Sequence, residues 1–312
     1  MNPVEDIAYV RLSAPDLDLM ETFLTDFGLE RVERTDDRLF MRGRGSEPVI
    51  HITERGEPGK LSFAFRVASR EDLDAAAARS GVTVEARTEP GGGHRVLLKD
   101  PDGNGVELVH GLVQADARTL RAPHAFNPGQ NRARMNTIVR DETRPSHVLR
   151  LGHVALHALN FPAMLAFYQD LLGMKISDSY YAGSPENLMA AFLHCGLGST
   201  FVDHHTIALI GDGRAGLDHT AFEVLDFDDL MVGNRHLLKQ DRWAHSWGVG
   251  RHKDGSQIFD YWRDPFGQKI EHWTDGDLVN DEYPSSSSSF SPETAADQLS
   301  QWGPPLTPDF MR

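Results

Sequence analysis

The strongest pattern of hydrophobic and polar positions along the chain occurs twice. Residues 7–15 read IAYVRLSAP and residues 151–159 read LGHVALHAL, and both alternate as a half-buried strand does. Each is followed by a run with the apolar spacing of an amphipathic helix, LDLMETFLTDF in one case and FPAMLAFYQDLL in the other. The two halves of the chain are therefore predicted to begin alike, with a strand and then a helix.

Matching signals mark the ends of these two predicted helices. Asp16 and Asn160 stand just before them, where a short polar side chain can accept hydrogen bonds from free backbone N–H groups. Gly28 and Gly173 stand at their ends, where glycine tolerates the left-handed conformation that stops a helix. Both helices are thus predicted to start and stop at equivalent positions of a repeat.

The two halves also close alike. Residues 97–108 read LLKDPDGNGVEL and residues 261–272 read YWRDPFGQKIEH. The Asp-Pro-x-Gly in each predicts a tight turn between two strands, because proline presets φ and glycine accepts a positive φ. The second strand carries a glutamate at the same offset, Glu107 or Glu271. With a further strand and an acidic helix start in the middle, each half is predicted to contain about two βαβββ units.

The repeat divides the chain into four predicted segments. Residues 1–112 form the first domain, residues 113–147 an inter-domain connection over the surface, and residues 148–278 the second domain. Residues 279–312 form a Ser/Pro-rich tail, which we expect to be flexible because of the serine run from Ser285 onwards. This tail could act as a lid over a pocket.

Composition narrows the classes of function. Acidic residues outnumber basic ones by 46 to 31, giving a formal net charge of -15, so we expect no nucleic-acid partner and no binding to an anionic membrane. We find no signal peptide and no run of about 18 apolar residues that could span a membrane. The single cysteine, Cys195, permits no internal disulfide and is expected in the core. A soluble cytoplasmic protein is the expectation.

Histidine is the unusual residue type, with 15 copies, most of them in the second half. His153 and His219 lie in predicted strands, and so does Glu271. Two imidazoles and one carboxylate form the facial set that leaves positions open on Fe(II) for a substrate and dioxygen. Zinc accepts the same donors. Taken alone, each of these residues is more often an ordinary strand residue than a metal ligand.

The first half of the chain lacks both histidines. Tyr9 stands at the position of the first, and Ser62 or Phe63 at the position of the second, depending on the placement of a one-residue gap. The fold therefore forms without these histidines, and their presence in the second half needs another reason. Glu107 does repeat the carboxylate, so a structural role in both halves remains open for that position.

Three further side chains in the second half suit proton chemistry. His205 follows His204 in an insertion at about residues 179–206, and an extended chain would turn these neighbours to opposite faces, so that one of them reaches the site. His252 and Tyr261 occur together in GRHKDGSQIFDYW. A histidine can take or return a proton near neutral pH, and a tyrosine can donate a hydrogen bond. The alternative is a polar, partly buried strand end.

As a set, five segments of the second half resemble the type I extradiol ring-cleaving dioxygenases of the vicinal oxygen chelate superfamily: LGHVALHALNFPAMLAFYQDLLGM, FVDHHTIAL, GLDHTAFEV, GRHKDGSQIFDYW and RDPFGQKIEHW. The resemblance covers about residues 7–276. It implies an α+β fold with two vicinal-oxygen-chelate domains, each of paired βαβββ modules that form a curved, incompletely closed mixed sheet. The first domain resembles the degenerate, metal-free one of such enzymes.

The resemblance also implies an activity and a site. It implies Fe(II), or Mn(II), used with O2 to cleave a catechol beside its two hydroxyls, giving a muconic semialdehyde-type product. The metal-ligand motifs match at His153, His219 and Glu271. The catalytic histidine matches His205, and the accompanying histidine and tyrosine match His252 and Tyr261. Relatives of this kind commonly assemble as homo-oligomers.

Two other functions remain open on the sequence. A metalloenzyme of the same superfamily with non-oxidative chemistry, an isomerase or a transferase, would keep the metal but not need the acid–base set. A binding or resistance protein that sequesters a small aromatic would need neither. For the dioxygenase, the lack of a clear arginine before His252, in RWAHSWGVG, favours a neutral or apolar catechol.

Overall fold

Two large mixed β-sheets form the body of the protein in the computed structural model, which describes residues 2–291 and 295–311. The strands of the first sheet are β1 (Asp6–Ala14), β2 (Glu30–Arg34), β3 (Arg38–Arg42), β4 (His51–Arg55), β5 (Leu61–Arg66), β6 (Val84–Ala86), β7 (His94–Lys99) and β8 (Gly105–His110). Those of the second are β9 (Val148–His157), β10 (Met174–Tyr181), β11 (Leu188–Cys195), β13 (Ile207–Ile210), β14 (Gly216–Val224), β15 (Ala244–His252), β16 (Ile258–Arg263), β17 (Lys269–Thr274), β19 (Ser286–Ser289) and β20 (Ser300–Trp302).

Five helices and one small sheet complete the described elements. The small sheet pairs β12 (Val202–Asp203) with β18 (Leu278–Val279). The helices are α1 (Leu17–Phe27), α2 (Arg70–Ser80), α3 (Phe161–Ala166), α4 (Phe227–Gln240) and α5 (Ala295–Leu299), and α3 continues into the π-helical turn η1 (Phe167–Leu171). In the described part of the chain, no helix has the length and apolar character needed to cross a membrane.

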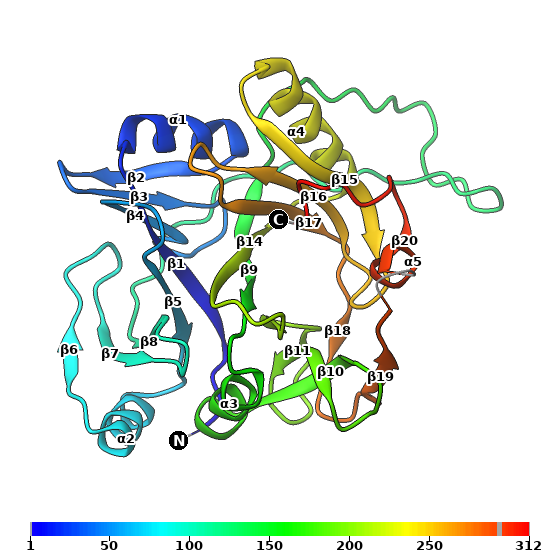
Figure 1. The fold of residues 1–312 in the computed structure, drawn as a ribbon. Coiled ribbons are helices and arrows are strands. Elements are labelled where there is room, and N and C mark those ends of the chain that lie inside the picture. The colour runs from blue at the N-terminus through cyan, green and yellow to red at the C-terminus, as the bar shows by residue number, and fades with distance from the viewer. Residues whose placement is uncertain (1, 292–294, 312) are drawn as a thin grey trace.

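The predicted repeat is confirmed by the order of the strands. The first sheet has the order β2-β3-β4-β1-β5-β8-β7-β6, and the central strands of the second have the matching order β10-β11-β13-β9-β14-β17-β16-β15 (Figure 1). Each module begins with a strand that pairs in parallel with its last strand, as β1 pairs with β4 and β9 with β13. Four βαβββ modules therefore build two open mixed sheets, the α+β class that was predicted.

The matching order also corrects one prediction. Residues 179–206 were interpreted as an insertion, but β10, β11 and β13 are the counterparts of β2, β3 and β4. The third module is longer than the first because β10 and β11 are longer than β2 and β3, and because the connection from β11 to β13 is longer and contains β12. The alignment of the two halves missed this because these strands share no motif.

Local signals explain where the elements begin and end. The Asp16 side chain accepts hydrogen bonds from two backbone N–H groups in the first turn of α1, and the Asn160 side chain accepts one, from Ala163, in α3. Gly28 ends α1 with a φ of 118°. In the two Asp-Pro-x-Gly turns, Gly103 and Gly267 have φ values of 92° and 91°, as the turn predicted.

One hydrophobic core extends through both halves of the protein. It includes Phe27 of α1 and Phe222 of β14, whose rings meet edge to face, and it also contains Cys195, as expected. His272 of β17 stacks on Phe27 and donates a hydrogen bond to its backbone carbonyl at 2.7 Å. Residues 111–147, all described, contain no helix or strand, and Figure 1 shows them as a long loop beside the second sheet.

The tail differs from the flexible segment predicted for it. Its serine run forms β19, which pairs in parallel with β10, and β20 pairs with β15. The two tail strands thus lie on the two outer strands of the second sheet (Figure 1). Outer strands have unpaired backbone groups, and the tail supplies hydrogen-bond partners for both of them. Its composition gave no sign of this, because the pairing depends on backbone groups rather than on serine side chains.

Candidate metal centre

His153, His219 and Glu271 come from three adjacent strands at the centre of the second sheet. His153 on β9 lies opposite Ala221 on β14, which in turn lies opposite Glu271 on β17. His219 is two residues before Ala221, and residues two apart in a strand share a face. Strand pairing therefore brings side chains that are far apart in the sequence to the same face of the sheet.

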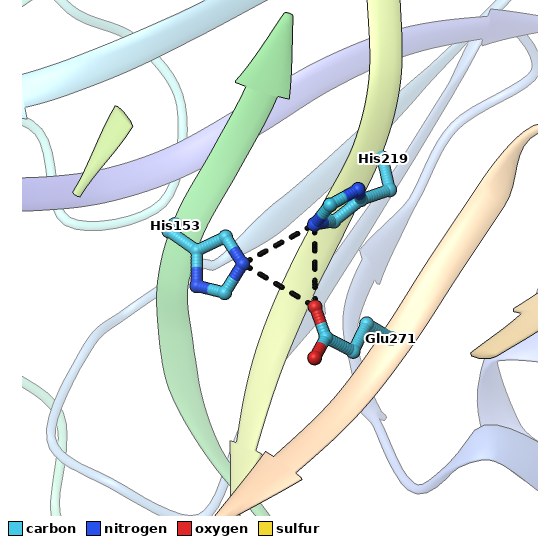
Figure 2. Close-up of side chains that lie close together, drawn as sticks. All are labelled: His153, His219 and Glu271. Atoms are coloured by element: carbon cyan, nitrogen blue, oxygen red, sulfur yellow. Dashed lines mark hydrogen bonds and ion pairs between the residues drawn. The ribbon is translucent and has the colours of Figure 1, made fainter. Parts of the chain in front are cut away.

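The donor atoms of these three residues form a nearly equilateral triangle, shown in Figure 2. His153 Nε2 lies 3.2 Å from His219 Nε2 and 3.3 Å from Glu271 Oε2, and His219 Nε2 lies 3.2 Å from the same oxygen. Neighbouring ligands about 2.1 Å from a shared octahedral ion are about 3 Å apart. The triangle therefore has the size of one face of an octahedron.

The state of Glu271 also fits a divalent cation. The side chain is fully buried, and neither of its oxygens has a hydrogen-bond partner among the described residues. Burial would raise its pKa, but the ring nitrogens of His153, His219 and His252 hold the pKa well below its usual range. A buried carboxylate without such bonds is costly unless a cation balances it. The residues present thus fit a metal ion, with ligand atoms of the hard and borderline type.

Asp218 orients one of the histidines and was missed in the sequence. Its Oδ2 accepts a hydrogen bond from His219 Nδ1 at 2.7 Å, so Nε2 carries the lone pair that points into the triangle. Strict alternation would turn these neighbours to opposite faces, but a register shift between Leu217 and His219 brings them to one side. Lys269 donates to the other Asp218 oxygen at 2.8 Å.

The three predicted acid–base residues lie beside the triangle. The ring centroid of His205 is 4.3 Å from that of His153, and Tyr261 on β16 lies opposite Glu271. Tyr261 and His252 are joined by a hydrogen bond of 2.9 Å. Of the two adjacent histidines, His205 lines the cavity described below, and the ring of its neighbour faces away from it. The structure therefore brings all six predicted residues together.

Hydrogen bonds and burial indicate the protonation of this group. His252 Nδ1 lies 3.0 Å from the carbonyl oxygen of Leu299, which can only accept, so Nδ1 carries a proton; a ring with this one proton accepts from Tyr261 at Nε2. Burial, with the negative charge of Glu271, raises the pKa of Tyr261 well above its usual value. Burial, with the neighbouring His153, lowers the pKa of His205 well below its usual value. The site thus offers a phenol donor and a neutral imidazole.

The triangle forms one end of a cavity of about 310 Å³. Most of the remaining walls are apolar and include Met189, Phe192, Leu209, Trp247, Phe290 and Phe310. Phe290 and Phe310 belong to the tail, and the Phe310 ring lies 4.5 Å from Trp247 and 4.9 Å from Tyr261. The tail therefore forms one wall of the cavity.

Two cations at the cavity were not anticipated from the sequence. Arg214 and Lys269 both line it. Arg214 donates to Asp212 at 2.6 Å, and Lys269 donates to Asp218 at 2.8 Å. Each cation therefore already has a carboxylate partner.

The equivalent position in the first sheet is occupied by a different set of side chains. Tyr9 lies opposite Ala64, which lies opposite Glu107, as in the second sheet. Ser62 is two residues before Ala64 and bonds Glu107 at 2.7 Å, whereas Phe63 lies in the core. Ser62 is thus the counterpart of His219, which decides between the two alignments left open by the sequence.

Guanidinium groups balance the charge of Glu107 in the first sheet. Tyr9 donates to Glu107 at 2.6 Å, and Arg11 Nε donates to it at 3.0 Å. Burial opposes ionisation of Glu107, but Arg11 and the hydrogen bonds hold its pKa below the usual value. Arg95 donates to the other oxygen at 3.3 Å, so the glutamate that both halves share faces two arginines in one half and two histidines in the other.

Known proteins are similar to this chain over almost its whole length. Residues 6–108 and 150–272 each match the Glyoxalase/Bleomycin resistance protein/Dioxygenase superfamily. Metapyrocatechase 2 of Cupriavidus necator is 30% identical over 99% of this chain and 92% of its own length. An iron-dependent extradiol dioxygenase of Rhodococcus jostii (strain RHA1) is 26% identical over 89% of this chain and 92% of its own. The crystal structure of a Mn(II)-bound glyoxalase from Novosphingobium aromaticivorans superposes with a TM-score of 0.80 at 26% identity, covering 99% of this chain and 94% of that one.

Proposed function

The chain belongs to the Glyoxalase/Bleomycin resistance protein/Dioxygenase superfamily and is an extradiol ring-cleaving dioxygenase within it, and from that premise we propose how its residues carry the reaction. The reaction uses a divalent metal and O2 to cleave a catechol beside its two hydroxyls, giving a muconic semialdehyde-type product. Both atoms of O2 enter the product.

The observation that carries this proposal is the triangle of donor atoms beside the cavity, which His153 and His219 line. His153, His219 and Glu271 would hold the metal, and the donor set suits Fe(II) and also Mn(II). When bound, the ion would supply open positions where the catechol oxygens and O2 meet. Three protein ligands on adjacent strands of one sheet would give the ion a stiff support.

His205 would act as the acid–base residue. The buried, neutral imidazole can take the proton of a catechol hydroxyl that enters the cavity and return a proton later in the reaction. Its ring lies against His153, so a substrate held at the triangle would be within reach. Tyr261 would donate a hydrogen bond to a substrate oxygen, and His252 would orient that hydroxyl.

The cavity favours a small, apolar catechol. Its volume lies at the lower end of the range of about 300–1,000 Å³ that is typical of ligand sites. Aromatic and aliphatic side chains form most of its walls, and the two cations at its edge already face carboxylates. A ring carrying an alkyl substituent would bury apolar surface there, whereas a free carboxylate would find no unpaired partner of this kind among the described lining residues.

Turnover of a catechol panel tests the function. The protein would be purified without O2, loaded with Fe(II), and given catechol, 3-methylcatechol, 2,3-dihydroxybiphenyl and a catechol that bears a carboxylate. We expect uptake of one O2 per substrate with a yellow product, fastest for the alkyl catechol, and loss of uptake when the iron is removed by a chelator. No uptake across the panel at full iron loading would contradict the proposal.

The same preparation separates the other functions. Conversion of an α-ketoaldehyde and a thiol without O2 would indicate the non-oxidative chemistry of the superfamily. Tight binding of an aromatic without any conversion would indicate a binding protein. A cytoplasmic location and assembly as a homo-oligomer also remain proposals, and light scattering on the purified protein measures the assembly.

A variant of the tail tests the wall of the cavity. We expect Phe310→Ala to raise the KM of the preferred catechol about tenfold, since losing about 1.4 kcal/mol of apolar contact has that effect. The value of kcat should change much less, because Phe310 packs against the ring of Tyr261 and makes no hydrogen bond to its hydroxyl, which His252 keeps in place.

Trp302→Ala is the matched control for this variant. Trp302 also belongs to the tail, but it lies half exposed on β20 and away from the cavity lining. Its replacement should leave KM within about twofold of the parent value. Equal effects of the two variants would show that the tail acts through stability and not as a wall.

A further inference from the structure

A chain of buried hydrogen bonds runs from His205 away from the cavity. His205 Nδ1 lies 3.1 Å from His204 Nδ1, and His204 Nε2 lies 2.7 Å from Asp178 Oδ2. All three side chains are at least 95% buried. The Phe192 ring packs against both histidines, so the two rings have little freedom to turn. Such a chain has a direction, because each bond needs one donor and one acceptor.

Asp178 sets the direction of this chain. Burial alone would raise its pKa, but the hydrogen bonds from His204 and Ser286 hold the pKa below its usual value. An ionised carboxylate can only accept, so His204 Nε2 must carry the proton. When the His204 ring carries this one proton, its Nδ1 is an acceptor, and the donor at the 3.1 Å contact is His205 Nδ1. His205 Nε2 is left with a lone pair.

We propose that Asp178 and His204 are positioning residues that fix the tautomer of His205, so that its Nε2 presents a lone pair to the cavity. Nε2 is the ring nitrogen that His205 has free on the cavity side, because Nδ1 is engaged with His204. A base must present a lone pair and not an N–H to the proton that it takes. The proposal rests on the proposed function, in which His205 is that base.

The tail holds Asp178, at the far end of the hydrogen-bond chain, in place. Ser286 of β19 donates to Asp178 Oδ1 through its backbone N–H at 2.9 Å and through its hydroxyl at 2.5 Å. Tyr283 donates to Oδ2 at 3.2 Å. Oδ1 therefore accepts both hydrogen bonds from Ser286, and Oδ2 accepts from His204 and, at the longer distance, from Tyr283. This division of the two oxygens makes the effect of an amide substitution definite.

Asp178→Asn should reverse the donors and acceptors along the hydrogen-bond chain. The two donors of Ser286 keep the amide oxygen at the Oδ1 position, which leaves the NH2 group opposite His204 Nε2. His204 must then accept at Nε2 and donate from Nδ1, and His205 must accept at Nδ1 and carry its proton on Nε2. The substitution therefore puts a proton on the nitrogen that should accept one, without changing a residue that lines the cavity. A wrong tautomer has the same effect in catalytic triads.

Nitrogen NMR of the protein loaded with Zn(II) measures the tautomer directly. With ¹⁵N-labelled histidine, and His205 assigned by its absence in His205→Gln, we expect Nδ1–H in the parent protein and Nε2–H in Asp178→Asn. In the Fe(II) enzyme, Asp178→Asn should lower kcat by about 100-fold or more, with KM and iron content nearly unchanged. The same His205 tautomer in both proteins would overturn the proposal, as would a parent protein with Nε2–H.

Two further variants keep the test decisive. His204→Phe keeps a ring against Phe192 but removes the acceptor, so His205 should populate both tautomers and kcat should fall; an unchanged tautomer and kcat would also overturn the proposal. Asp281→Asn removes a carboxylate that pairs with Lys175 and lies beside the buried His194; among the described hydrogen bonds and ion pairs, neither partner bonds Asp178 or the side chains of His204 and His205, so the tautomer and kcat should stay unchanged. The NMR measurement needs no turnover, so it tests the tautomer independently of the catechol panel, which tests the proposed function.

Discussion

Glu271→Gln is expected to abolish iron binding under conditions where the parent protein is fully loaded. The amide keeps the size of the side chain but removes the negative charge at the triangle, which is fully buried. Loss of an outer partner of a metal ligand alone costs about 10–100-fold in affinity, and loss of a ligand should exceed that. Ring cleavage should fall by at least the same factor. Metal analysis after dialysis and O2 uptake with the preferred catechol measure both effects.

Glu107→Gln is the matched control, since the two glutamates occupy the same place in the repeat. Glu107 bonds Tyr9, Ser62 and Arg11 and contacts no proposed metal ligand. Its replacement should leave iron content and turnover intact. It should lower the free energy of unfolding by about 3 kcal/mol, the lower end for a broken buried ion pair, because Arg11 keeps Glu54 and Glu89. Iron loss in both variants, or in neither, would contradict the assignment of Glu271.

His205→Ala is expected to lower kcat by about 100- to 10,000-fold, the usual contribution of a general acid–base residue. Iron content should stay close to that of the parent protein, because His205 contacts His153 through its ring and is not part of the triangle. Metal analysis and single-turnover experiments, started by mixing O2 with the anaerobic substrate complex, separate the two quantities. Loss of iron in this variant would place His205 among the ligands instead.

His194→Ala controls for the loss of a buried imidazole. His194 lies on β11 and bonds Ser177 at 2.7 Å, but it does not line the cavity. Its replacement should affect stability and leave kcat within a few-fold of the parent value. A fall in kcat comparable to that of His205→Ala would show that packing around the third module, and not proton transfer, accounts for the loss.

Much of the fold could be predicted from the sequence because its signals are local. Alternation marked the strands, Asp16 and Gly28 marked the ends of a helix, and the Asp-Pro-x-Gly turns marked the closing hairpins. The repeat then indicated which strands would lie together. The comparison of the two halves also separated residues that the fold needs from His153 and His219, which it does not need.

The tail and the third module were predicted less well, for a common reason. β19 consists of serines, and neither composition nor periodicity distinguishes it from a flexible segment. Its place depends on the unpaired backbone of β10, an element more than 100 residues earlier in the chain. Long-range pairing of this kind leaves no mark in a local window of sequence.

The sequence by itself determined the repeat, because side-chain alternation and turn chemistry act between near neighbours. The comparison of the two halves and the resemblance to a known family then indicated the sheets and the candidate set of His153, His219 and Glu271. Only the tertiary structure decided how these residues are supported. The bulge at Asp218 turns the Asp218 side chain toward His219, and the hydrogen-bond chain that starts at Asp178 ends at His205. Both depend on register and on contacts between distant strands, where a shift of one residue changes which side chains meet.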